Sequence, residues 1–132
     1  MNMTTFDFGN GSVPAHKHPN GGGWVADTAT VADTAYVGPD AKVFDNARVY
    51  GNAHIYGDAW VSGDAQVYGK AKVYDNAEVF GNADVFGNAD VFGNACVSGK
   101  AQVSGNAQVY GEVEEDMFIE MNGKRYKLVE VE

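Results

Sequence analysis

His54 is the residue in this sequence whose chemistry is most useful for catalysis, because an imidazole can act as a general base toward an acceptor hydroxyl or amine. Tyr36 lies 18 positions before His54, Lys72 lies 18 positions after it, and Tyr56 follows two positions later. The alternative interpretation, which we prefer, is that His54 is an exposed member of a column of stacked side chains. His54 is therefore our candidate catalytic residue only in an enzyme interpretation.

Two further groups of reactive side chains, the histidines near the N-terminus and the single cysteine, do not predict a functional site. His16 and His18 form a His-Lys-His segment, but two ligands leave a zinc site incomplete, and adding His54 lacks the expected spacing, so we predict no metal site. Cys96, the single cysteine, follows Glu78 by 18 positions. A neighbouring carboxylate disfavours a thiolate, so we expect no nucleophilic role for Cys96 and no disulfide within the chain.

A strict six-residue repeat must position all these side chains. An aliphatic residue fills every sixth position, and alanine stands two places before it, except that Gly23 precedes Val25. In an extended chain these two residues point to one side, and the neighbours of the aliphatic residue point to the other. Glycine followed by Asn or Asp ends most units, as is typical of a turn. The aliphatic positions are Val25, Val31, Val37, Val43, Val49, Ile55, Val61, Val67, Val73, Val79, Val85, Val91, Val97, Val103 and Val109.

Strands this short cannot bury an apolar side alone, so the units must coil into a solenoid in which each strand pairs with its equivalent one turn away. The unit Ala-x-Val-x-Gly-Asn, as at residues 83–88, resembles the hexapeptide-repeat proteins over residues 24–111. That resemblance implies a left-handed parallel β-helix with three hexapeptides per coil. We predict an all-β solenoid of about five triangular coils, roughly 24 Å tall at a strand spacing of about 4.8 Å.

The resemblance also implies an activity, because many hexapeptide-repeat proteins are homotrimeric acyltransferases that use acetyl-CoA or a related acyl-CoA. Their active sites lie between neighbouring prisms and commonly use a His on a loop that leaves the coil. This chain departs from the pattern: its repeat admits no inserted loop, its C-terminal segment does not read as a helix, and no His follows the repeat. A small CoA-dependent O- or N-acyltransferase, with His54 as base, is therefore an alternative, and we favour no enzyme and no cofactor.

The charge distribution opens a second alternative. The formal net charge is −9, which argues against direct nucleic-acid binding, since that depends on Lys and Arg at phosphates. An acidic rod could instead imitate the phosphate rows of DNA and inhibit a DNA- or RNA-binding protein, as a phage-type inhibitor would. Simple solubility is the preferred explanation. No apolar run approaches the roughly 20 residues of a membrane span. We expect a cytoplasmic protein, or a phage-encoded one acting in the host cytoplasm.

Both ends of the repeat resemble caps, which solenoids use to cover their terminal coils. Residues 1–23 form an N-terminal cap or entry segment in which Phe6 and Phe8 are placed to fold over the first coil, and residues 20–23 form a flexible entry.

The C-terminal segment, residues 112–132, carries seven acids and three bases. Within it, residues 117–121 and 124–131 flank Asn122-Gly123, which predicts an acidic β-hairpin cap with a type I′ turn.

The outward positions, counted in steps of 18, form columns on three faces. On the first face Lys42 stands between Trp24 and Trp60, which predicts a cation–π arrangement. The third face has an aromatic residue on four consecutive coils, and such a ladder both stabilises a sheet and leaves an apolar strip in water. We predict that this strip forms the interface of a homotrimer or docks a protein partner, so that the chain acts as a non-catalytic scaffold or binding module. Its members are Tyr56, Tyr74, Phe92 and Tyr110.

Overall fold

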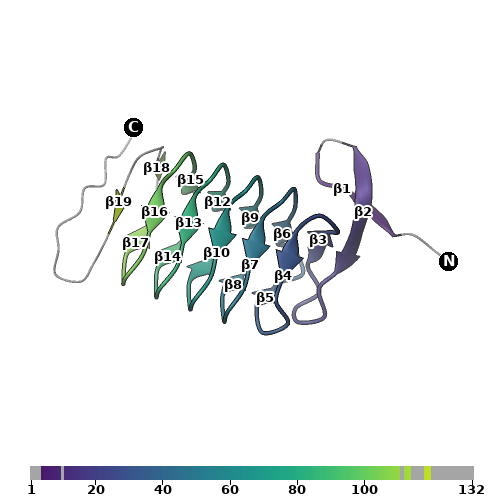
Figure 1. The fold of residues 1–132 in the computed structure, drawn as a ribbon, viewed down its shortest axis with the longest axis horizontal. Helices are drawn as coiled ribbons and strands as arrows, with labels where there is room; N and C mark the ends of the chain where they lie inside the picture. The colour runs from purple at the N-terminus through teal and green to yellow at the C-terminus, as the bar shows by residue number, and fades with distance from the viewer. Residues whose placement is uncertain (1–3, 10, 111, 114–117, 120–132) are drawn as a thin grey trace.

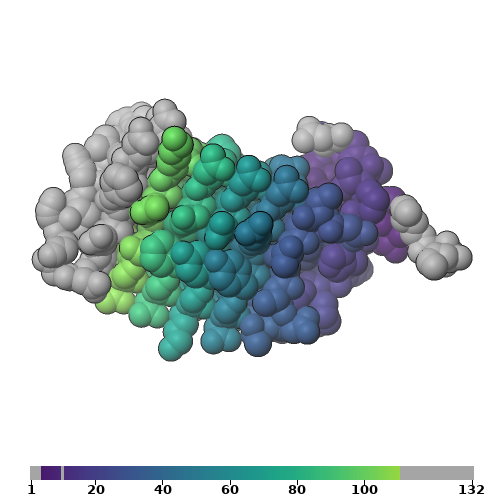
Figure 2. All heavy atoms as spheres, viewed as in Figure 1, coloured from purple at the N-terminus to yellow at the C-terminus, as the bar shows by residue number. Residues whose placement is uncertain are grey.

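The molecule is a stack of coils with a β-hairpin at its N-terminal end (Figure 1). The computed structural model describes residues 4–9, 11–110, 112–113 and 118–119. The strands of successive coils follow one another along the long axis, and the space-filling view shows the stacked coils as parallel bands (Figure 2). No helix that could span a membrane occurs among the described residues.

Three sheets run along the stack, and each collects every third strand of the repeat. The first, in spatial order, contains β1 (Thr5–Asp7), β2 (Ser12–Lys17), β3 (Trp24–Ala26), β6 (Lys42–Val43), β9 (Trp60–Val61), β12 (Glu78–Val79), β15 (Cys96–Val97) and β18 (Glu112–Val113). The second contains β19 (Phe118–Ile119), β16 (Gln102–Val103), β13 (Asp84–Val85), β10 (Gln66–Val67), β7 (Arg48–Val49) and β4 (Thr30–Val31). The third contains β17 (Gln108–Val109), β14 (Asp90–Val91), β11 (Lys72–Val73), β8 (His54–Ile55) and β5 (Tyr36–Val37).

The pairing register follows the 18-residue step that the sequence predicts. Val49 pairs with Val67 and Val67 with Val85, all in parallel strands. The all-β parallel solenoid of about five turns is thus confirmed. From β4 to β17 each strand is only two residues long, because the chain turns after the residue that follows each aliphatic residue.

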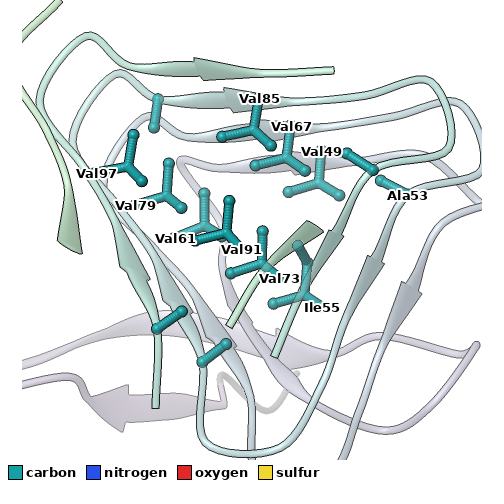
Figure 3. Close-up of a cluster of buried hydrophobic side chains, with 14 of the residues drawn as sticks. Val49, Ala53, Ile55, Val61, Val67, Val73, Val79, Val85, Val91 and Val97 are labelled. Atoms are coloured by element: carbon teal, nitrogen blue, oxygen red, sulfur yellow. The ribbon is translucent and has the colours of Figure 1, made fainter. Parts of the chain in front are cut away.

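Valine and alanine side chains fill the interior of the coils. Every aliphatic residue of the repeat is fully buried except Val31, which is partly exposed in the first coil. Figure 3 shows these side chains pointing inward from the three sheets, with Ile55 beside Val73. Burying each one contributes about 1.5 to 3 kcal/mol before chain entropy is subtracted. The interior is continuous, so no coil has a core of its own.

Glycine is needed at the corners because stacked corners approach closely. Gly57 has a φ of 66°, and a Cβ added there would lie 2.8 Å from the amide nitrogen of Asp75. Residues with a side chain rarely adopt this left-handed backbone conformation, and a Cβ would also be too close to the next corner. Both reasons favour glycine.

The N-terminal cap is a hairpin of β1 and β2, and β2 then pairs antiparallel with β3. The ring of Phe6 stacks on Trp24 at 4.7 Å, and that of Phe8 stacks on Phe44 at 4.8 Å. These rings cover the outward side of the first two coils on the first sheet.

The prediction of a flexible entry at residues 20–23 is wrong, because this segment is hydrogen-bonded to β5. The carbonyl of Asn20 accepts from the Val37 amide, and the Gly23 amide donates to the Val37 carbonyl, both at 3.0 Å. A Cβ on Gly21 would lie 2.1 Å from the Val37 carbonyl oxygen. These glycines allow a close approach of two backbones.

Beyond the repeat, β18 and β19 extend two of the sheets in parallel. Val97 pairs with Val113, a step of 16 residues in place of 18, so the register changes here. The predicted hairpin at 117–131 lies outside the described residues apart from Phe118–Ile119.

Candidate binding surface and the His54 groove

The aromatic ladder of the third sheet consists of Tyr56, Tyr74, Phe92 and Tyr110, each directly after an inward aliphatic residue. Successive ring centroids lie 4.9, 5.3 and 5.5 Å apart. Tyr56 and Tyr74 are within 4° of parallel, so their faces cover each other and their edges point outward. Tyr110 is 62% exposed, whereas the other three are half-buried. The ladder therefore presents a strip of ring edges and phenol hydroxyls.

A second ladder, Tyr50, Tyr68 and Phe86, lies on the second sheet. Its ring centroids are 4.7 and 5.0 Å apart, and the rings are parallel within 4°. The Tyr50 hydroxyl donates to the side-chain oxygen of Gln66 at 3.1 Å, so one of its phenols is used within the chain. The third-sheet ladder is one ring longer, and its last pair, Phe92 and Tyr110, is tilted by 30°, whereas all rings of the second ladder are parallel within 4°.

The phenols of Tyr56, Tyr68 and Tyr74 remain neutral over a wide pH range. Burial is the main cause that raises the pKa of Tyr56, Tyr68 and Tyr74 above the ordinary value of 10.0. Neighbouring charges act in the same direction, from Asp90 on Tyr56 and Tyr74 and from Asp84 on Tyr68. These three side chains are thus uncharged near neutral pH.

His54 lies beside the third-sheet ladder in a shallow groove of about 350 Å³. Its Nδ1–H donates to the backbone carbonyl of Asn52 at 2.9 Å, which leaves Nε2 as the nitrogen able to accept a proton. Its ring lies 5.8 Å from that of Tyr36, and His54 pairs in register with Tyr36 and Lys72, as the 18-residue count predicts. The groove is lined by Asn52, His54, Lys70, Lys72, Asn88 and Asp90.

The corner residues of this groove were not predicted from the sequence. Asn52, Lys70 and Asn88 are spaced by 18, so the same count applied to the corners identifies them. Lys70 and Lys72 give the groove two positive charges against the single carboxylate of Asp90. It could attract an anion, but its cations are exposed to water, where such attraction is weak.

Lys42 lies over two aromatic rings of the first sheet. One is Trp60, as predicted, and the other is Phe6 in place of the predicted Trp24. Its Nζ is 5.8 Å from the Trp60 ring and 5.9 Å from the Phe6 ring. Phe6 from the cap covers Trp24, and Trp24 is faced instead by Lys17 at 5.5 Å. The hexapeptide repeat contains no information about Phe6, so the count alone could not show this exchange.

His16 and His18 both contact other residues of the chain. The Nδ1 atom of His16 lies 2.7 Å from a carboxylate oxygen of Asp27. Buried His18 donates from Nε2 to the carbonyl of Ala35 at 2.9 Å, so the two histidines have different partners. No group of three or more metal-ligating residues occurs in the part of the chain that the structure describes. Cys96 is half-buried and pairs in register with Glu78.

An apolar pocket, unexpected from the sequence, lies where the cap meets the first two coils. Its volume is about 200 Å³. The pocket depends on the hairpin folding back over Phe44, which the repeat pattern does not encode. It is lined by Phe8, Gly11, Val13, Pro14, Ala26, Asp27, Thr28, Phe44 and Asp45.

Comparisons with known proteins agree with the fold. A family model described as a YdcK beta solenoid repeat matches residues 53–69. No curated protein and no solved structure matches the chain. The match covers a single turn of the repeat, so it supports a β-solenoid repeat protein and assigns no activity.

Proposed function

We propose that this protein is a non-catalytic β-solenoid scaffold that associates into a homotrimer through its third-sheet aromatic ladder. The observation that supports the proposal is the row of four outward rings on consecutive coils, Tyr56 to Tyr110. Such a strip is costly to leave in water and is typical of a contact surface.

The internal geometry of the ladder favours association. Tyr74 is held between Tyr56 and Phe92, so docking it requires little further loss of side-chain freedom. Its phenol is neutral, so burying it carries no cost of removing a charge from water. Parallel prisms related by a threefold axis could each place this strip against a neighbour, which closes the assembly.

Replacing Tyr74 with Glu tests the proposal. Glu at this position places a charge in the centre of the strip, and we expect the mass measured by light scattering to fall from about three chains to one. Tyr68→Glu is the matched control, because Tyr68 is also the middle ring of a parallel stack and also has an aspartate nearby. We expect this control to keep the wild-type mass.

Two results would contradict the proposal. One is a monomeric wild type at micromolar concentration. The other is an equal loss of mass in Tyr74→Glu and Tyr68→Glu, which would show that a general loss of stacking, and no specific contact, causes dissociation.

The orientation of His54 favours a second candidate, a CoA-dependent acyltransferase. Its Nε2 is available as a base, and a neighbouring prism docked on the ladder would form a second wall for the groove that contains Lys70 and Lys72. In that case millimolar acetyl-CoA releases heat on titration, and Lys70→Ala with Lys72→Ala lowers the affinity, whereas the exposed Lys100→Ala does not. Absence of both heat and thermal stabilisation at millimolar acetyl-CoA removes this candidate.

A further inference from the structure

At its N-terminal end the first coil has three strand edges, β3, β4 and β5. The N-terminal segment pairs with the backbone of β3 and β5 but not, among the described residues, with that of β4. Each edge presents the same backbone groups toward the N-terminal end: a carbonyl from the inward alanine or glycine, then the amide and carbonyl of the inward valine. β3 is covered by β2 through antiparallel pairing. Among the described strands, β4 is paired only with β7, and it is the terminal strand of the second sheet.

At β5 all three backbone groups are paired by the segment that follows β2. The Val37 amide and carbonyl bond to Asn20 and Gly23. The Ala35 carbonyl accepts from His18 Nε2 at 2.9 Å and from the Asn20 side-chain amide at 3.0 Å. This segment therefore replaces a strand of a preceding coil.

At β4 the equivalent groups are the Ala29 carbonyl and the Val31 amide and carbonyl. Within residues 4–9, 11–110, 112–113 and 118–119, no group bonds to any of these three atoms. Thr30 and Ala32 donate only to the next coil, toward Ala47 and Val49. Val31 is also the one inward repeat valine that is partly exposed. An edge whose backbone groups have no partner among the described residues, and whose valine is partly exposed, is a template for another strand.

The apolar pocket continues this edge. Thr28 lines the pocket and directly precedes Ala29, whose carbonyl begins the open edge. Phe8, Phe44 and the apolar hairpin residues Val13 and Pro14 form its apolar walls, and Val13 is 38% exposed. A volume of about 200 Å³ has room for one aliphatic side chain.

The rim of the pocket is acidic. Asp27 and Asp45 line it and are exposed, and Asp33 follows β4 two residues after Val31. One oxygen of Asp27 contacts His16, and one oxygen of Asp45 accepts from the Gly63 amide, so each carboxylate keeps an oxygen outside these contacts. Basic side chains complement this rim, whereas a second copy of the chain, with a net charge of −9, is repelled by it.

We propose that the open edge of β4 binds an extended, basic segment of a partner protein by β-strand addition. The segment pairs with Ala29 and Val31, inserts one aliphatic side chain into the pocket beside Phe8 and Phe44, and places Lys or Arg near Asp27 and Asp45. The edge belongs to the second sheet and the pocket lies beside the first sheet, and neither shares a residue with the third-sheet ladder.

Amide hydrogen exchange followed by NMR tests the proposal, with Val37 as an internal control. In the free protein the Val31 amide exchanges fast and the Val37 amide, bonded to Asn20, exchanges slowly. The probes are three synthetic peptides that alternate valine with lysine, glutamate or serine. We expect the lysine peptide to slow exchange at Val31 by about tenfold or more at saturation, and the same peptide with N-methylated backbone amides to have no effect.

Two variants of the hairpin test the role of the pocket. Val13→Lys fills the pocket and adds a positive charge, whereas Ser12→Lys adds the same charge one position away, outside the residues that line it. We expect Val13→Lys to weaken peptide affinity by about tenfold or more relative to Ser12→Lys.

The proposal is overturned if the Val31 amide is already protected in the free protein, or if no peptide of the panel changes its exchange. It is also overturned if protection of Val31 rises with protein concentration alone, since a second copy is then the occupant. Equal affinity of the lysine and glutamate peptides would contradict the proposal that the partner segment is basic.

Discussion

Asp45 and Asp75 occupy the corner position that glycine fills in most coils, and both adopt its left-handed conformation, with φ of 59° and 62°. Each carboxylate accepts the amide of the glycine one coil further on, from Gly63 at 3.2 Å and from Gly93 at 3.1 Å. This hydrogen bond offsets a backbone cost of about 1 to 2 kcal/mol. The sequence predicts a corner at these positions, but the same residue type at Asp27 has no positive φ.

Asp84 is a residue at which the fold disfavours a charge. It stands between Gln66 and Gln102 on the second sheet, and burial raises the pKa of its carboxyl above 3.8. The native state therefore holds this proton more tightly than the unfolded chain does. The contribution of Asp84 to stability is full below pH 3.8 and is lost as the pH rises through the folded pKa.

Asp84→Asn should consequently stabilise the protein at neutral pH. Asn cannot ionise, so the gain, less than about 1 kcal/mol because the side chain is only partly buried, is largest near pH 7 and disappears in acid. Urea unfolding at several pH values measures it. Asp64→Asn, at an exposed corner, is the control and should change the free energy of unfolding at pH 7 by less than about 0.5 kcal/mol. A gain that grows toward low pH would contradict the assignment.

At the scale of elements, the step of 18 residues explains what could be predicted. Strand pairing repeats at that step, so the count alone places Tyr56 over Tyr74 and His54 over Lys72. The columns of both ladders follow from the same argument, because successive coils differ only by a translation along the stack. Side-chain contacts within a column are thus readable from the sequence.

The cap could not be predicted in the same way. Phe6 covers Trp24 and Phe8 covers Phe44 because the hairpin of β1 and β2 folds back, and that path depends on contacts between non-repeating segments. The open edge of β4 has the same origin. Whether β4 is paired depends on where the N-terminal cap ends, and the cap is not part of the six-residue repeat.

At the scale of the whole molecule, the interior is one continuous cluster of Val and Ala in which each coil packs only on its neighbours. Stability in such a stack is the sum of contacts between adjacent coils, so coils with a neighbour on both sides are held more firmly than the first. Val73 lies between coils on both sides, whereas Val31 has β7 on one side and no described strand on the other. The two valines thus occupy the same position in the repeat, but Val73 is fully buried and Val31 is only partly buried.

Matched Val→Ala variants measure this difference. Val73→Ala removes two methyl groups from a fully buried position and leaves a cavity, so we expect the free energy of unfolding to fall by about 2 kcal/mol or more. Val31→Ala, at a partly exposed position, should cost less than about 1 kcal/mol. Urea unfolding with unchanged slope measures both. Equal costs would mean that the edge of β4 is covered in solution, because only an enclosed Val31 could lose as much as Val73.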